Sequence, residues 1–145
     1  MAEPILSRNV VIGVAAHKPY RMPVDSAYLP IHVGAALNPG ACPGFQPDDE
    51  GESISGLNAS YSELTGLYWL WRNADADVKG LVHYRRLLGS PDPVRRRAED
   101  PFDRVAAGEE LRSLVDANRV VLARRRNYYI ETVYDHYSHT FDGTQ

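Results

Sequence analysis

The stretch Gly80-Leu81-Val82-His83-Tyr84-Arg85-Arg86 decides the fold, because a short apolar run ends abruptly in aromatic and cationic side chains. Such a run is typical of a buried strand, predicted here over Gly80–Tyr84. In an open parallel sheet, ligands bind in the crevice beyond the carboxyl ends of the strands. Arginine binds phosphate through paired hydrogen bonds, so Arg85 and Arg86 predict an anion site at this sheet edge. The alternative is an arginine pair in surface salt bridges, with His83 as a hydrogen-bonded core residue.

Strand and helix patterns alternate around this run. Asn9–Ala16 is continuously apolar, as expected for a strand covered on both faces of a parallel sheet. A helix is predicted over Tyr61–Asn73, opened by a capping box at Ser60–Glu63. A second helix is predicted over Phe102–Ala117, followed by a strand over Arg119–Ala123. This order predicts an α/β fold, with a mostly parallel open sheet flanked by helices.

Helical spacing also predicts which side chains are inward. The first helix should pack on the sheet through Leu64, Leu67, Tyr68 and Trp71, and this would leave Trp69 partly exposed. Gly66 inside that helix predicts a close approach of a neighbour to the backbone. In the second helix the residues expected to be inward are Val105, Leu111, Leu114 and Val115.

Composition sets limits on the class of protein. A chain of 145 residues predicts a single domain, 1–145. The net charge of −3 argues against a general nucleic-acid binder. Cys42 is the only cysteine, which excludes an internal disulfide and a thiolate metal cluster. Because no basic segment followed by a long apolar stretch opens the chain, we expect a soluble, cytoplasmic protein.

The segment Pro19–Ser55 has many prolines and little periodicity, which predicts an irregular stretch with a short helix near Ile31–Ala36. It contains the acidic loop Asp48-Asp49-Glu50-Gly51-Glu52. This loop has enough oxygens for a hard cation, and a solvated turn is the alternative. Asp75-Ala76-Asp77 has the spacing of a metal-binding Asp-x-Asp motif. Because it precedes a strand, we expect it to end a helix in solvent instead.

Ionisable and aromatic groups gather near the end of the chain. A helix that starts near Asn127 would place Glu131, Asp135 and His139 on one face, with His136 beside them. Carboxylate and imidazole on one face predict an acid/base pair or a metal site, and Asp135 with His136 is the preferred pair. Structural hydrogen bonding is the alternative.

Six segments, in order, carry a family resemblance. They are His17-Lys18-Pro19-Tyr20 with Met22-Pro23, Tyr28–Ala35, Asp48–Ser55 with Asn58, the Glu63-Leu64-Thr65 helix, His83–Arg86, and Arg126–Thr132. Together they resemble a bacterial glycosyltransferase-like family of capsular and exopolysaccharide gene clusters, long catalogued as a domain of unknown function. Some of its members are galactofuranosyltransferases. The departures are Glu52, Ser62 and Arg72, where the family tends to have asparagine, cysteine and lysine.

The resemblance implies a GT-A-like fold and transfer of a sugar from a nucleotide-diphosphate donor, most simply a UDP-sugar, to a glycan acceptor in cell-surface polysaccharide synthesis. It also implies contact with membrane-bound polysaccharide machinery at the inner face of the membrane. Family domains continue further, so a carboxyl-terminal portion is expected to be missing and transfer by this chain alone to be poor. The implied donor-binding residues are His17, Lys18, Asp48, His83, Arg85, Arg86, Arg126, Asn127 and Glu131.

The predicted catalytic residues are Asp135, His136 and Asp49, and Glu63 is a helix cap that only the resemblance makes a site residue. The arginines at the expected metal position predict charge neutralisation without a metal, with Mn²⁺ or Mg²⁺ as the alternative. Two other functions are open. One is a non-catalytic module that binds nucleotide sugars or glycans, and the other is a metal-dependent hydrolase built on Asp48, Asp49 and His136.

Overall fold

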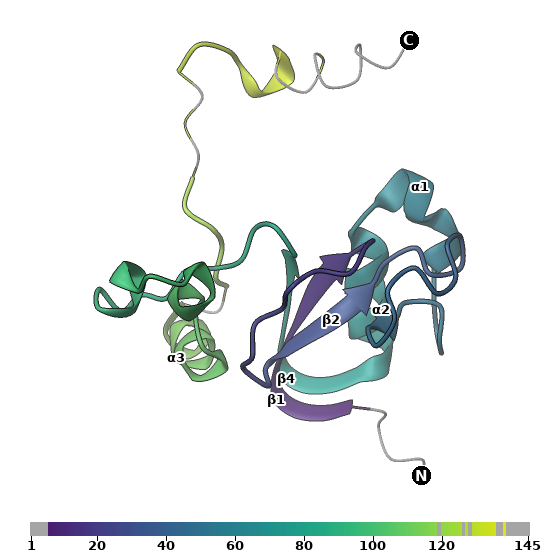
Figure 1. Ribbon diagram of the computed structural model, residues 1–145, viewed down its shortest axis with the longest axis horizontal. Coiled ribbons are helices and arrows are strands. Elements are labelled where there is room, and N and C mark those ends of the chain that lie inside the picture. Colours follow the sequence, from purple (N-terminus) through teal and green to yellow (C-terminus); the bar gives the residue numbers. More distant parts are fainter. Residues whose placement is uncertain (1–5, 119, 126, 128, 136–137, 139–145) are drawn as a thin grey trace.

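A parallel sheet of four strands forms the centre of the computed structural model, which describes residues 6–118, 120–125, 127, 129–135 and 138. The strands β1 (Leu6–Ala16), β2 (Tyr28–His32), β3 (Gln46–Pro47) and β4 (Ala74–His83) lie in the order β3-β2-β1-β4 (Figure 1). Ala15 of β1 pairs with His83 of β4, so both strands end at the same sheet edge. The predicted parallel α/β architecture is therefore confirmed.

The central strand β1 separates two apolar cores, because its side chains alternate between the two sheet faces. Val10, Ile12 and Val14 pack on one face with Leu111 of helix α3 (Gly108–Asn118). Val11 and Ala15 pack on the other face, against helix α2 (Leu64–Asn73). Burial on both faces explains the unbroken apolar run that predicted this strand.

The helix predicted over Tyr61–Asn73 is two helices, α1 (Asn58–Tyr61) and α2. Ser62 lies between them in the left-handed region, at a φ of 49°. Neither helix has a side-chain hydrogen bond at its N-cap, so the predicted capping box is wrong. Ser62 and Glu63 instead belong to the turn that joins the helices.

The predicted inward face of α2 was also wrong. The buried residues are Thr65, Gly66, Trp69 and Leu70, whereas Leu64, Leu67 and Trp71 are exposed. The sequence of α2 has apolar residues at helical spacing on two faces, and contacts with the sheet decide which face is buried. Gly66 lets α2 approach closely, since a Cβ there would lie 2.9 Å from Val33 Cγ1. The buried Trp69 also donates its indole N–H to the carbonyl of Glu50 at 2.7 Å.

The predicted irregular segment Pro19–Ser55 contains β2 and β3, and the expected helix near Ile31–Ala36 is absent from this described segment. Strand β2 instead ends at His32, and residues 33–37 form a turn. Pro30 in the middle of β2 hid this strand from sequence reasoning, because proline cannot donate to a ladder of hydrogen bonds. Short 3-10 turns follow elsewhere: η1 (Ser55–Leu57), η2 (Arg95–Arg97) and η3 (Pro101–Arg104).

The second helix begins six residues later than predicted, at Gly108, after η3 has formed a separate turn. Leu111 is buried as expected, and Leu114 and Val115 are half-buried. The predicted strand over Arg119–Ala123 is wrong in its described residues, 120–123, which pair with no strand. Val120 and Val121 still line a cavity with Ile12 of β1 and Val82 of β4, and the chain beyond them leads away from the sheet (Figure 1). The Asp75-Ala76-Asp77 motif lies at the start of β4 instead of ending a helix, and both aspartates are exposed to solvent as expected.

Candidate functional site

A cavity of about 250 Å³ opens at the carboxyl ends of β1 and β4. We call it the edge cavity. Its lining residues are Ala15, His17, Val33, Asn58, Ser62, Glu63, His83 and Arg85. The cations predicted from two distant segments, the exit of β1 and the exit of β4, thus meet in one place. This is where an open parallel sheet is expected to bind a ligand.

One ring nitrogen of His83 accepts a hydrogen bond, and the other faces a carboxylate. The backbone N–H of Arg85 donates to Nδ1 at 3.2 Å, so the neutral imidazole carries its proton on Nε2. Nε2 lies 3.7 Å from Glu63 Oε1. Burial lowers the pKa of His83 and outweighs the opposing effect of Glu63, and Arg85, Arg86 and His17 lower the pKa further. His83 therefore offers a neutral N–H donor at neutral pH.

Tyr84 is the buried ring around which the cations at this edge are arranged. The ring of His17 meets it edge-on, with centroids 5.5 Å apart. Lys18 Nζ lies 5.9 Å and the Arg85 guanidinium 5.4 Å from its centroid. Contacts of cations with an aromatic face contribute about 0.5–1 kcal/mol at exposed sites, enough to bias these side chains toward the edge.

The two arginines after β4 have different positions. Strand β4 ends at His83, and the backbone N–H of Arg86 donates to the carbonyl of His83 at 2.8 Å, which closes a tight turn. Arg85 lines the edge cavity together with His83. Arg86 is exposed and lies outside the lining of that cavity. The structure therefore brings one arginine of the predicted pair to the site.

Asp48 is fully buried and holds together the loops behind the edge cavity. Its carboxylate accepts from the backbone N–H groups of Gly34 at 3.0 Å and Ala35 at 3.1 Å, and from the hydroxyls of Ser55 and Thr65, the latter at 2.6 Å. Four donors occupy its two oxygens, so we reassign Asp48 from donor contact to a positioning residue. The solvated-turn alternative is wrong for this residue.

Asn58 and Ser62 connect this anchor to the cavity wall, and sequence reasoning missed both as lining residues. Asn58 Nδ2 donates to the carbonyl of Ser62 at 2.7 Å and to Thr65 Oγ1 at 3.0 Å. The only sequence signals were that Asn58 belongs to a resembling segment and that Ser62 lies at a position where the family tends to have cysteine. Glu63 was expected to cap a helix, but it makes no capping bond and its carboxylate faces His83.

The other predicted catalytic and donor residues lie elsewhere. Asp49 is exposed and lies outside the lining of the edge cavity, on a loop that continues to the far half of α2, where Glu52 pairs with Arg72. Asp135 caps a helical turn, accepting from Thr132 Oγ1 at 2.7 Å while its own N–H donates back at 3.1 Å. Arg126 and His136, and with them His139, fall outside the described residues.

Asn127 is exposed, and Glu131 is half-buried in the segment that runs away from the sheet (Figure 1). The helix expected to begin near Asn127 is first described at residue 133. The described part of this segment therefore does not reach the edge cavity, whose lining contains none of its residues.

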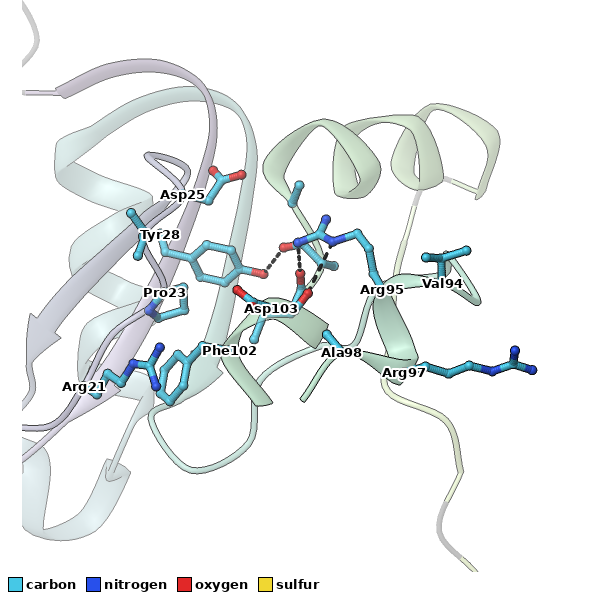
Figure 2. Close-up of a pocket in the computed structure, with 14 residues that line it drawn as sticks. Arg21, Pro23, Asp25, Tyr28, Val94, Arg95, Arg97, Ala98, Phe102 and Asp103 are labelled. Carbon is cyan, nitrogen blue, oxygen red and sulfur yellow. Dashed lines mark hydrogen bonds between the residues drawn. The ribbon is translucent and has the colours of Figure 1, made fainter. Parts of the chain in front are cut away.

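Another hollow, of about 520 Å³, lies away from this chemistry, between the start of β2 and residues 94–107 (Figure 2). Its polar groups pair with one another. Tyr28 donates to the carbonyl of Ala106 at 2.6 Å, and Arg95 pairs with Glu110 at 2.7 Å. Burial raises the pKa of Tyr28 to about 12. Arg97, by contrast, is directed away from the hollow (Figure 2). We interpret this hollow as a structural junction.

The described residues contain no group of three or more histidine, cysteine, aspartate or glutamate side chains that could hold a metal ion. In the Asp-x-Asp motif, Asp77 pairs with Arg112 at 3.1 Å on β4, away from the edge cavity. The described residues therefore do not fit a resident metal site. No helix within the described ranges has the length and apolarity needed to cross a membrane.

Comparison with known families matches residues 11–145 to the family described as Domain of unknown function (DUF4422). The chain belongs to this family. Among solved structures, the apo form of the bifunctional glycosyltransferase WbbM is 36% identical over 65% of this chain, with a TM-score of 0.54. The match covers 16% of the length of that protein. A comparison with curated proteins gave no match.

The DUF4422 sheet described here is thus a glycosyltransferase-like α/β layer of the GT-A type, as the resemblance implied. At 36% identity, the similarity to that protein supports a glycosyltransferase-like family as well as a shared fold.

Proposed function

We propose that this DUF4422 chain binds a nucleotide-diphosphate sugar, a UDP-sugar in the simplest case, and forms the donor half of a glycosyltransferase site for cell-surface polysaccharide. The observation that carries the proposal is the convergence of His17, His83 and Arg85 on one cavity at the carboxyl edge of the sheet. The likeness to a glycosyltransferase supports the reaction class. The proposal includes a UDP-sugar as the donor and a glycan as the acceptor. It also includes association of the chain with membrane-bound polysaccharide machinery at the inner face of the membrane.

The diphosphate is expected to lie against Arg85 and His83. Arg85 is exposed, and no hydrogen bond or ion pair ties its guanidinium to another described side chain, so its donors are available to phosphate oxygens. His83 adds its Nε2 proton, which in this structure is directed at Glu63. Negative charge develops on the diphosphate as it leaves, and preorganised N–H donors stabilise it without a metal.

Glu63 is the carboxylate of the edge cavity and is the base in this proposal, in place of Asp49 and Asp135. It would accept the proton of the acceptor hydroxyl. The hydroxyl oxygen then forms the bond to the anomeric carbon of the donor, the bond from that carbon to the phosphate oxygen breaks, and the nucleotide diphosphate leaves with the electron pair.

Isothermal titration with UDP tests the donor site, using Arg85→Ala and its neighbour Arg86→Ala as a matched pair. Loss of a charged hydrogen bond costs about 1.5–3 kcal/mol, so Arg85→Ala should weaken binding roughly tenfold or more. Arg86→Ala should change the affinity little, because Arg86 lies outside the cavity. Equal effects of the two substitutions, or none, would contradict the proposal.

Transfer of a radiolabelled sugar tests the base. Glu63→Gln should retain UDP affinity and lose acceptor-dependent turnover, whereas Asp49→Asn should retain both. Because transfer by this chain alone is expected to be poor, slow hydrolysis of the bound donor is followed as well. UDP binding with neither transfer nor donor hydrolysis by the unmodified chain would favour the alternative, a nucleotide-sugar-binding module. Metal-dependent hydrolysis that requires Asp49 would support the hydrolase and overturn our assignment.

A further inference from the structure

A second cavity, of about 290 Å³, adjoins the edge cavity and shares Arg85 with it. We call it the aromatic cavity. Its walls come from three separate segments: Tyr20 after β1, the turn after β4 with Tyr84 and Arg85, and the η3 region with Phe102 and Arg104. A molecule bound here would therefore lie next to the proposed donor site, with Arg85 between the two.

Aromatic rings give this cavity its character. Tyr20 meets Tyr84 at a centroid distance of 5.0 Å and an interplanar angle of 63°, yet 48% of Tyr20 remains exposed. Phe102 is fixed from one side by the Arg21 guanidinium, 4.2 Å from its ring centroid. An apolar pocket with rigid rings and a few polar groups suits a ring-shaped ligand with a C–H face.

The charged groups that line the aromatic cavity are two arginines. Arg104 is held by the carbonyls of Ala98 at 2.7 Å and Glu99 at 3.2 Å, whereas Arg85 has no such partner in the described chain. A guanidinium donates hydrogen bonds and cannot accept them. A nucleobase edge presents both donors and acceptors, but the hydroxyls of a sugar can all accept. Donors beside aromatic rings therefore favour a sugar ring over the base of a nucleotide.

We propose that the aromatic cavity binds a sugar ring of the acceptor glycan. This inference rests on the proposed function, because it places the acceptor next to the donor diphosphate. The ring lies with its C–H face on Tyr20, and its hydroxyls accept from Arg85 and Arg104. A hydroxyl on the side of Arg85 is directed toward the edge cavity, where Glu63 can remove its proton. Both cavities share the Arg85 guanidinium, which couples occupancy of one to occupancy of the other.

Saturation-transfer NMR with a panel of methyl hexopyranosides and methyl hexofuranosides tests this subsite. We expect transfer to the C–H protons of one ring face. Tyr20→Ala should weaken that binding about fivefold to tenfold, while Tyr20→Phe, which keeps the ring, should retain it. Tyr61→Ala is the matched control, because Tyr61 is 50% exposed and lines neither cavity.

The same titration with UDP separates this inference from the proposed function. Glycoside binding that depends on Tyr20 and persists with UDP present supports the acceptor subsite. Displacement of the glycoside by uridine would show that a base occupies the cavity and would overturn the inference. UDP binding with no glycoside binding would also overturn it and leave the donor site intact. Tyr20-dependent glycoside binding without UDP binding would instead refute the donor site alone.

Discussion

Replacing Asp48 with asparagine should destabilise the protein more than any surface change nearby. The carboxylate accepts four hydrogen bonds and is fully buried. An amide keeps one acceptor oxygen and turns the other position into a donor, so two of the four donors lose their partner. Hydrogen bonds to a charged group contribute about 1.5–3 kcal/mol each. Asp48→Asn should therefore cost about 3–6 kcal/mol of the free energy of unfolding.

Urea denaturation followed by circular dichroism measures this cost. With a slope of about 2 kcal/mol per molar, in the middle of the range for small domains, the midpoint should fall by about 1.5–3 M. Asp49→Asn is the matched control and should stay within about 0.5 kcal/mol, because Asp49 is exposed. Thr65→Val removes one donor to Asp48 and the Oγ1 acceptor of the Asn58 amide, and should give an intermediate loss. A midpoint for Asp48→Asn equal to that of Asp49→Asn would refute the role of Asp48 as an anchor.

Three further predictions concern single positions. Gly66→Ala should lower stability by about 1 kcal/mol in urea melts, since the clash with Val33 exceeds the gain in helix propensity; a stabilised variant would contradict the packing. Tyr28→Phe should cost about 1 kcal/mol of the free energy of unfolding, because it loses the hydrogen bond to the carbonyl of Ala106. The wild type should lose stability as the pH rises from about 10 through the Tyr28 pKa of about 12, and Tyr28→Phe should not show this loss. Burial lowers the pKa of His83 in the folded protein below its value of about 6.5 in the unfolded chain. The stability that the neutral imidazole contributes is therefore fully present above about pH 6.5 and is lost as the pH falls below it. Wild type should therefore lose more stability on acidification than His83→Gln, and equal pH slopes for the two would exclude the burial effect.

Local chemistry made part of this protein predictable from sequence. The run before Ala16 is apolar because β1 is covered on both faces. The cations after β1 and β4 could be assigned to one edge, because parallel strands bring their carboxyl ends together. Membership of the family was predictable because its motifs are short and local. All of these inferences depend on residues close together in the chain.

Tertiary contacts decided the rest, because the sequence contained more than one solution of similar local quality. Two apolar stripes on α2 had helical spacing, and close packing at Gly66 selected the one with Trp69. In the sequence Asp48 looked like its acidic neighbours. In the structure it accepts hydrogen bonds from four donors on three other segments. The pairing of Glu63 with His83, and the placing of Tyr20 near Arg104, arise between segments about 20 or more residues apart. Sequence therefore determined the core of β1, the end of β4 and the cations that follow them, whereas only the fold revealed β2 and β3 and decided which cations share a cavity. The reason is that periodicity carries no information about contacts between distant segments.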